Sequence, residues 1–268
     1  MEYSIYRPSG IGSDGFLAYR ISPPLLKSPT DPYLRIDLFE LSSPTFPPRP
    51  LAGLVSAAYV FPESVGSLRF RDSLGGDSLL EPGGLCWTRS GRGLVQEEVP
   101  SGGTATGVKF LVNMPRETEL DAPRALQFPA GSLPSVPLSC GRATLLAGEW
   151  GGARGPAEGD SPLMVADIEL AGGSFVLPAP EGWTSFAFLR SGRLRIGGEE
   201  LLPGEVLVHG SPVACDAGPG ARLTLFQGQP LQEPVEHFGP FSMSDRLRNR
   251  LAVRSYRSGG MGSLEPSS

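Results

Sequence analysis

Two turn-rich segments hold the residues of this sequence whose types and spacing are best suited to chemistry. The first, residues 46–53, places Arg49 among prolines, and the second, residues 90–100, carries Gln96 and Glu98 after a Gly-Arg-Gly turn. A guanidinium and a carboxylate form strong charge-assisted hydrogen bonds, and an amide can join them. Each segment runs from a Pro/Gly turn into an apolar strand. We expect the two to face each other across a small β-barrel.

The remaining chemically capable residues are isolated. His209 and His237 lie in unlike contexts, and a lone imidazole needs a converging partner to act as a base or a metal ligand, so we expect structural or solvent-edge roles. Serines occur in many turns without a paired histidine, which disfavours a hydrolase triad. Cys86, Cys140 and Cys215 are far apart and odd in number, so we expect buried apolar side chains rather than a disulfide framework.

The elements that must position these residues are predicted to be strands. The chain has 36 Gly and 28 Pro among 268 residues, and its hydrophobic residues, 40% of the total, come in short runs between turns. That punctuation favours many strands and few helices. Residues 67–70 resemble residues 192–196, and residues 80–84 share a Pro-Gly turn with residues 201–205. This recurrence after about 120 residues predicts a duplicated β-barrel.

One helix is expected, near residues 244–258. Ser244 is a suitable N-cap, Gly259 and Gly260 follow as a stop signal, and Leu247 and Leu251 have helical spacing. We expect the arginines of this helix to form its solvated face, with a docking surface as the alternative.

Charge and hydropathy exclude several classes of function. The net charge is −5 and the 23 basic residues form no run, so nothing indicates direct binding to nucleic acid or to an anionic membrane. The N-terminus has no apolar signal core, and no apolar run is long enough to span a bilayer. We expect a cytoplasmic protein.

Motifs along nearly the whole chain resemble the pirin family. They are Arg7-Pro8-Ser9-Gly10, Asp31-Pro32, Phe46-Pro47-Pro48, Tyr59, Arg71-Asp72-Ser73, Pro82-Gly83, Trp87, Gly91-Arg92-Gly93, Glu98-Val99-Pro100, Val112-Asn113, Pro230-Leu231-Gln232-Glu233-Pro234-Val235 and Gly239-Pro240-Phe241. The resemblance implies an all-β fold of two stacked cupin (jelly-roll) barrels with a C-terminal helix. The expected domains are 1–135 and 136–268, the second including the helix.

The resemblance also identifies a family metal site. Pirins hold Fe(II) or a similar divalent metal with three His and one Glu in the N-terminal barrel, and those positions correspond here to Arg49, Leu51, Gln96 and Glu98. Leucine offers no donor atom, and a guanidinium repels a cation. We therefore expect a degenerate site that binds no metal or other cofactor. Our hypothesis is that Arg49 takes the place of the metal by pairing with Glu98, with Gln96 as a further partner.

The predicted function is that of a pirin-like bicupin acting as a non-catalytic small-molecule-binding or regulatory protein. The candidate pocket residues in the N-terminal barrel are Arg49, Leu51, Trp87, Gln96 and Glu98, and Arg49 could anchor a carboxylate ligand. Two alternatives follow from the resemblance. One is a metal-dependent oxygenase of the quercetin 2,3-dioxygenase kind, and the other is an interaction partner that regulates a transcription factor or an enzyme.

Overall fold

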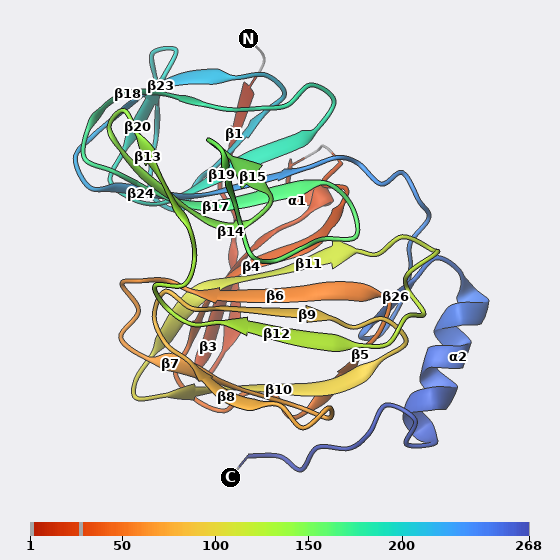
Figure 1. The fold of residues 1–268 in the computed structure, drawn as a ribbon. Coiled ribbons are helices and arrows are strands. Elements are labelled where there is room, and N and C mark those ends of the chain that lie inside the picture. The colour runs from red at the N-terminus through yellow and green to blue at the C-terminus, as the bar shows by residue number, and fades with distance from the viewer. Residues whose placement is uncertain (1–2, 27–28, 268) are drawn as a thin grey trace. The chain divides into compact units, whose positions relative to one another are not determined.

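The computed structural model describes residues 3–26 and 29–267, and their fold is almost entirely β-structure (Figure 1). Short apolar or alternating runs form the strands, and turns rich in Gly and Pro separate them. The all-β fold predicted from the sequence is therefore confirmed. The chain divides into two compact units, which we call the N-terminal barrel and the C-terminal barrel.

The N-terminal barrel contains two antiparallel sheets and the end of the chain. It comprises residues 10–20, 33–132 and 231–268. The larger sheet, in the order β12-β9-β6-β11-β4-β3-β2, contains β2 (Gly10–Ser13), β3 (Phe16–Ile21), β4 (Tyr33–Leu41), β6 (Leu54–Val60), β9 (Leu85–Arg89), β11 (Ala105–Asn113) and β12 (Arg124–Phe128). The smaller sheet, in the order β5-β10-β7-β8, contains β5 (Arg49–Leu51), β7 (Ser67–Asp72), β8 (Asp77–Leu80) and β10 (Leu94–Ser101). The end of the chain adds the ribbon of β25 (Glu236–Phe238) and β26 (Phe241–Met243), followed by the helix α2 (Arg246–Arg257).

The C-terminal barrel repeats this arrangement. It comprises residues 1–9, 21–32 and 133–230. The larger sheet, in the order β1-β22-β19-β24-β17-β14-β13, contains β1 (Tyr3–Tyr6), β13 (Ser135–Leu138), β14 (Gly141–Ala147), β17 (Leu163–Leu170), β19 (Thr184–Ser191), β22 (Val206–His209) and β24 (Ala221–Gly228). The smaller sheet, in the order β18-β23-β20-β21, contains β18 (Gly173–Leu177), β20 (Leu194–Ile196), β21 (Glu199–Leu201) and β23 (Val213–Ala217). A short helix, α1 (Pro23–Leu26), and the ribbon of β15 (Glu149–Trp150) and β16 (Ala153–Arg154) complete the unit.

The sheet orders of the two barrels match place by place. In the larger sheets, the central strands β9-β6-β11-β4 of the N-terminal barrel correspond to β22-β19-β24-β17 of the C-terminal barrel, so the predicted duplication is confirmed. The edge strand next to them comes from different parts of the chain. It is β12 in the N-terminal barrel and β1 in the C-terminal barrel. Strand β1 pairs there with β22, with Tyr3 opposite His209 and Tyr6 opposite Val206.

The structure corrects the expected domain limits at both ends of the chain. The division into residues 1–135 and 136–268 assigned the first strand to the first domain and the helix to the second. Instead, β1 belongs to the C-terminal barrel, whereas α2 belongs to the N-terminal barrel. The physical reason is long-range pairing. Phe241 bridges to Ala52, and Ala252 of α2 joins the apolar cluster that contains Val95.

The helix expected near residues 244–258 is confirmed as α2, but its N-cap differs from the expected one. Asp245, not Ser244, is the N-cap, and its carboxylate accepts from the backbone N–H of Arg248 at 2.8 Å. Leu247 and Leu251 are 64% and 48% exposed, so the helix does not pack through them. The buried side carries Asn249 and Ala252 instead.

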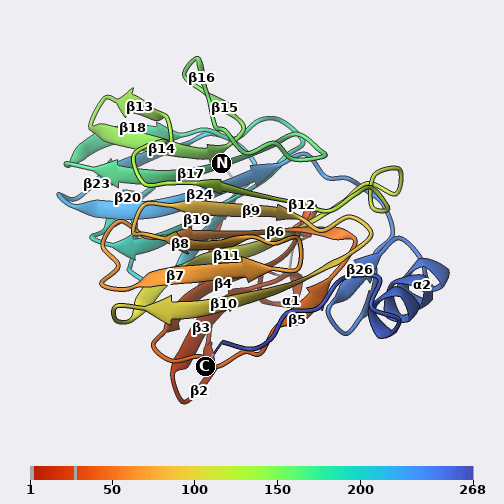
Figure 2. The same ribbon diagram turned by 60° about the horizontal axis from the view of Figure 1, so that its bottom comes forward.

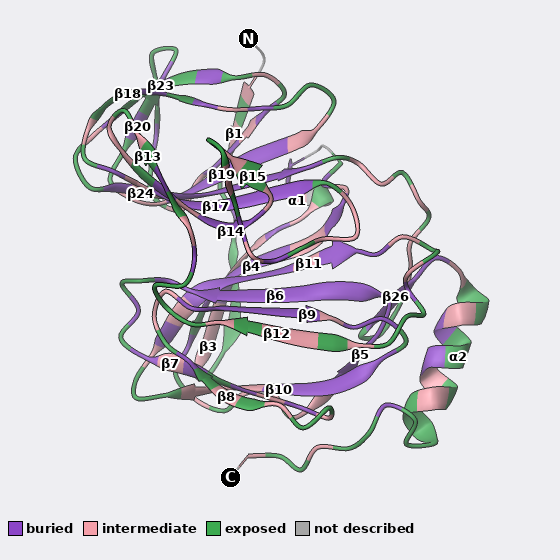
Figure 3. Cartoon of the chain, viewed as in Figure 1, coloured by how far each residue is buried: buried purple, intermediate pink, exposed green. Residues whose placement is uncertain are grey.

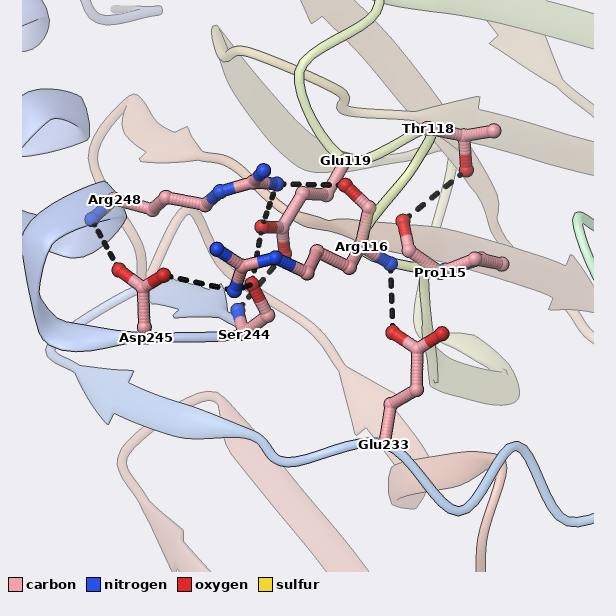
Figure 4. Close-up of polar contacts among 8 residues, drawn as sticks. All are labelled: Pro115, Arg116, Thr118, Glu119, Glu233, Ser244, Asp245 and Arg248. Atoms are coloured by element: carbon pink, nitrogen blue, oxygen red, sulfur yellow. Dashed lines mark hydrogen bonds and ion pairs between the residues drawn. The ribbon is translucent and has the colours of Figure 1, made fainter.

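A buried carboxylate sets the orientation of this helix (Figure 4). Glu119, 1% exposed, accepts from the backbone N–H of Ser244 at 2.8 Å and from its hydroxyl at 2.6 Å, and it also contacts the guanidinium of Arg248. Arg116 donates to Asp245 at 2.8 Å. These contacts hold the first turn of α2 against the segment that follows β11, beside β26 (Figures 1 and 2).

Burial is concentrated in the central strands of the larger sheets (Figure 3). Every residue of β6 is buried, whereas α2 is buried along one side only. None of the helices in the described part of the chain is long and apolar enough to cross a membrane.

Candidate functional site

The expectation that the two segments face each other across the barrel is wrong, because β5 and β10 are neighbouring, paired strands of the smaller sheet. Their pairing brings the four positions singled out in the sequence onto one face. Gln96 lies directly opposite Arg49 in the antiparallel register, and Leu94 lies opposite Leu51. Opposed residues of an antiparallel pair point to the same side of the sheet, and so do residues two apart along a strand. Arg49, Leu51, Gln96 and Glu98 therefore share the inner face of the smaller sheet.

Glu98 is the centre of this group, and three polar side chains contact it. Gln96 Nε2 donates to Glu98 Oε1 at 2.7 Å, and Arg49 Nη2 lies 3.5 Å from Glu98 Oε2. The third partner is Lys109, whose Nζ donates to Glu98 Oε1. The guanidinium of Arg49 also lies over the ring of Phe46, 5.2 Å from its centroid. Arg49 thus points toward Glu98, the arrangement that our hypothesis required.

Lys109 is the residue that sequence reasoning missed. It lies in β11, in the opposite sheet, and is only 8% exposed. The signal available in the sequence is a single lysine inside an apolar strand, between Val108 and Phe110. A buried lysine needs a partner, but nothing local indicates which carboxylate supplies it.

A cavity of about 170 Å³ opens beside Glu98. Its charged lining comes from Arg20, Arg35, Asp37, Arg49, Glu98 and Lys109, and its apolar lining from Phe16, Phe39, Leu41, Phe46 and Leu68. Asp37 is shared by two arginines, with Arg20 Nε at 2.7 Å and Arg35 Nε at 3.0 Å. Glu98 is likewise shared by two cations. Four basic groups against two carboxylates leave the lining with a formal charge of +2.

Opposing effects set the ionisation of the central pair. Burial would raise the pKa of Glu98, but Lys109 and Arg49 outweigh it and hold that pKa below its usual value. Burial lowers the pKa of Lys109 to about 8, because the attraction of Glu98 only partly compensates the desolvation and Arg49 repels the ammonium. Burial likewise lowers the pKa of Arg35. Glu98 is therefore an anion at neutral pH, and the cavity lining around it carries more positive than negative charges.

Trp87 does not line this cavity, and its assignment as a pocket residue is wrong. Its register partner is Ala57, and its ring meets that of Phe110 with centroids 5.8 Å apart. The neighbouring residues Cys86 and Lys109 lie on the opposite face of the same sheet, because successive side chains alternate. Leu51 and Gln96 share the inner face with Glu98 but are buried rather than part of the cavity lining.

The donor set does not fit the metal ion that the family resemblance implies. Of the four corresponding positions only Glu98 supplies a carboxylate, and two cations already contact it. Among the described residues, no three His, Cys, Asp or Glu side chains lie close enough together to hold a metal ion. First-row metals bind through imidazole, thiolate and carboxylate donors, so these residues are unsuited to one.

The two histidines lie elsewhere. His209 Nδ1 lies 3.0 Å from the carbonyl oxygen of Ser211, and His209 Nε2 lies 3.0 Å from Ser185 Oγ, which also accepts from Gln227 at 2.9 Å. The expectation that the serines lack a histidine partner is therefore wrong for Ser185 and for Ser242. The side-chain groups of Ser185, His209 and Gln227 are buried and satisfy one another, and burial lowers the pKa of His209, which indicates a neutral structural imidazole. His237 is exposed in β25 and pairs with Ser242 at 2.9 Å.

The cysteines are free, as expected, and Cys86 and Cys215 are buried, whereas Cys140 is only partly buried. Burial raises the pKa of both Cys86 and Cys215 to about 12, so neither forms a thiolate at neutral pH.

Duplicated barrels of paired antiparallel sheets define the class of protein as a bicupin. The profile of the Pirin C-terminal cupin domain matches residues 165–262. A pirin-like protein of Solanum lycopersicum is 30% identical over 93% of this chain and 88% of its own length. Pirin of Mus musculus is 30% identical over 90% of this chain and 86% of its own length. The crystal structure of a quercetin 2,3-dioxygenase from Acinetobacter baumannii has a TM-score of 0.84 at 26% identity and covers 97% of both chains. The chain belongs to the pirin family.

Proposed function

We propose that the N-terminal barrel binds a small organic anion without a metal ion, as a non-catalytic binding or regulatory protein. The observation that carries this proposal is the sharing of each carboxylate in the cavity by two cations. One positive charge beside each of Asp37 and Glu98 is left uncompensated. Arg20, Arg35 and Arg49 are each about one-third exposed, so their guanidiniums are accessible to a ligand. A carboxylate is the group that such guanidiniums recognise.

The size and apolar lining of the cavity narrow the ligand class. A cavity of about 150 Å³ holds benzene, and this one measures about 170 Å³. Phe16, Phe39 and Phe46 supply aromatic surface next to the cations. The ligand expected here is a single-ring aromatic acid or an aliphatic acid of similar volume.

The alternative function is the oxygenase activity named for the Acinetobacter baumannii structure. Its support is family membership. Two observations disfavour this activity. The side chains around Glu98 are unsuited to a metal ion. The volume of the cavity also suits one ring better than the fused and linked rings of a flavonol.

Calorimetric titration with benzoate and with uncharged benzamide tests the proposal, with metal content measured on the same sample. Benzoate should bind and benzamide should not, and Arg49→Gln should weaken benzoate binding about tenfold, as expected for a hydrogen bond to a charged group. Arg195→Gln, at an exposed arginine of the C-terminal barrel, is the matched control and should change nothing. Stoichiometric iron or nickel in the purified protein would overturn the proposal and favour the oxygenase.

A further inference from the structure

A groove of about 890 Å³ runs between the helix α2 and the strand β25. One face of the helix forms its basic wall, and Phe238 belongs to the opposite wall. The helical lining residues recur every three or four positions, so they share one side of α2; they include Arg246, Arg250, Val253, Arg254 and Arg257.

The basic wall is largely uncompensated. Arg246 lies 3.6 Å from Glu236, and both side chains are well exposed. Arg250, Arg254 and Arg257 are exposed and have no ion-pair partner within the described residues. Three unpaired guanidiniums on one helix face contrast with the net charge of −5 of the whole chain.

Apolar groups accompany these charges. Phe238 is 62% exposed, and Val253 is half-buried in the lining. Leu247 and Leu251 are exposed on the neighbouring side of the helix. Exposed large apolar residues next to a charged stripe are typical of a surface that binds another protein.

One polar residue of the groove lining is buried and structural. Asn249 is 4% exposed, and its Nδ2 donates to the carbonyl oxygen of Glu236 at 2.6 Å. This contact joins the helix to the strand on the other side of the groove.

The two walls are held in place before any partner binds. Asn249 ties β25 to the helix, and the contacts of Glu119 and Arg116 fix the first turn of α2 (Figure 4). A preformed groove binds with a smaller ordering cost than a mobile one.

We infer that this groove docks an acidic, partly apolar peptide segment of a partner protein. Arg246, Arg250 and Arg254 follow one another by about 6 Å along the helix axis. Side chains on one side of an extended peptide recur every 7 Å or so, so a segment in which acidic and apolar residues alternate matches the stripe. A nucleic acid would extend past the patch onto a chain of negative net charge, and a flat bilayer cannot enter the groove.

Fluorescence anisotropy of a labelled peptide in which glutamate alternates with leucine tests this inference. The wild type should bind, with an affinity that falls as salt rises. Arg250→Gln/Arg254→Gln should weaken binding about tenfold through the loss of two ion pairs. The matched control Arg193→Gln/Arg195→Gln removes two exposed arginines of the C-terminal barrel and should bind like the wild type. Circular dichroism should show the same helix content in all three proteins.

Three results would overturn the inference. The first is equal binding of a peptide with glutamine in place of glutamate. The second is tighter binding of an oligonucleotide or of phosphatidylserine vesicles through the same two arginines. The third is a self-association of the chain that Arg250→Gln/Arg254→Gln abolishes, since the occupant would then be a second copy.

Discussion

The interiors of the two barrels are built on the same strand order but differ in chemistry at one pair of corresponding strands. In the N-terminal barrel, β10 directs Gln96 and Glu98 inward, and Lys109 meets them from the facing sheet. In the C-terminal barrel, the corresponding strand β23 directs Val213 and Cys215 into an apolar cluster. The jelly-roll scaffold therefore tolerates either interior. A charged interior persists only where each charge finds a partner within it, since desolvation is costly.

The strongest test of this difference places a charge in the apolar barrel. Cys215→Glu introduces a carboxylate at a position that is 2% exposed and surrounded by the apolar cluster. We expect a loss of about 4 kcal/mol or more in the free energy of unfolding, or failure to fold. Urea unfolding measures it, with Cys215→Ala as the control for lost volume. A loss no larger than that of the control would show that the C-terminal interior accepts charge.

The reciprocal test removes the charges of the N-terminal barrel. Lys109→Met leaves Glu98 with Arg49 and Gln96 only, and we expect a loss of about 3 kcal/mol because a buried carboxylate loses its nearest cation. The double variant Lys109→Met/Glu98→Leu should recover to within about 1 kcal/mol of the wild type. Urea unfolding of the wild type, Lys109→Met, Glu98→Leu and the double variant gives the coupling free energy between the two side chains. Additive losses would mean that the two side chains do not stabilise each other.

A third test asks whether the charged group has replaced a metal site. Arg49→His/Leu51→His/Gln96→His, with Glu98 kept, supplies the ligand set that the family resemblance implies. Combined with Lys109→Met, it should bind Ni²⁺ and gain about 2.7 kcal/mol of stability at a hundredfold excess over Kd. Calorimetry and thermal unfolding with and without Ni²⁺ check this. Continued failure to bind would show that the backbone of β5 and β10 no longer suits a metal.

The smallest expected effect is a pH dependence specific to the N-terminal barrel. The folded pKa of Lys109 is about 8, below the value of about 10.4 in an unfolded chain. Between these values the unfolded state binds more protons, so this group makes the protein more stable as pH rises. The free energy of unfolding of the wild type minus that of Lys109→Met should therefore increase by about 1 kcal/mol per pH unit from pH 8 to pH 10. Urea unfolding at a series of pH values measures this difference. A difference that stays constant or falls with pH would contradict the prediction.

Local patterns predicted much of this molecule, and the errors share one origin. Alternating runs located the strands, and the Pro-Gly turns at residues 80–84 and 201–205 indicated the duplication. Trp87 was misplaced because four of the five residues of β9 are buried, so the strand shows no alternation from which its inward face could be chosen. The buried side of α2 could not be assigned from the sequence for a related reason. Its orientation is set by Glu119, which is 125 residues away from Ser244.

The sequence by itself determined the all-β duplicated fold, the pirin resemblance and the residue types at positions 49, 51 and 96, which differ from the ligands that the resemblance implies. These features depend on residue types and on periodicity within short segments. Only the tertiary structure decided that Lys109 joins Arg49 and Gln96 at Glu98, and that β1 and α2 belong to the barrels opposite to those expected. Strand pairing and the burial of charge depend on long-range contacts, and no short window of sequence contains both partners.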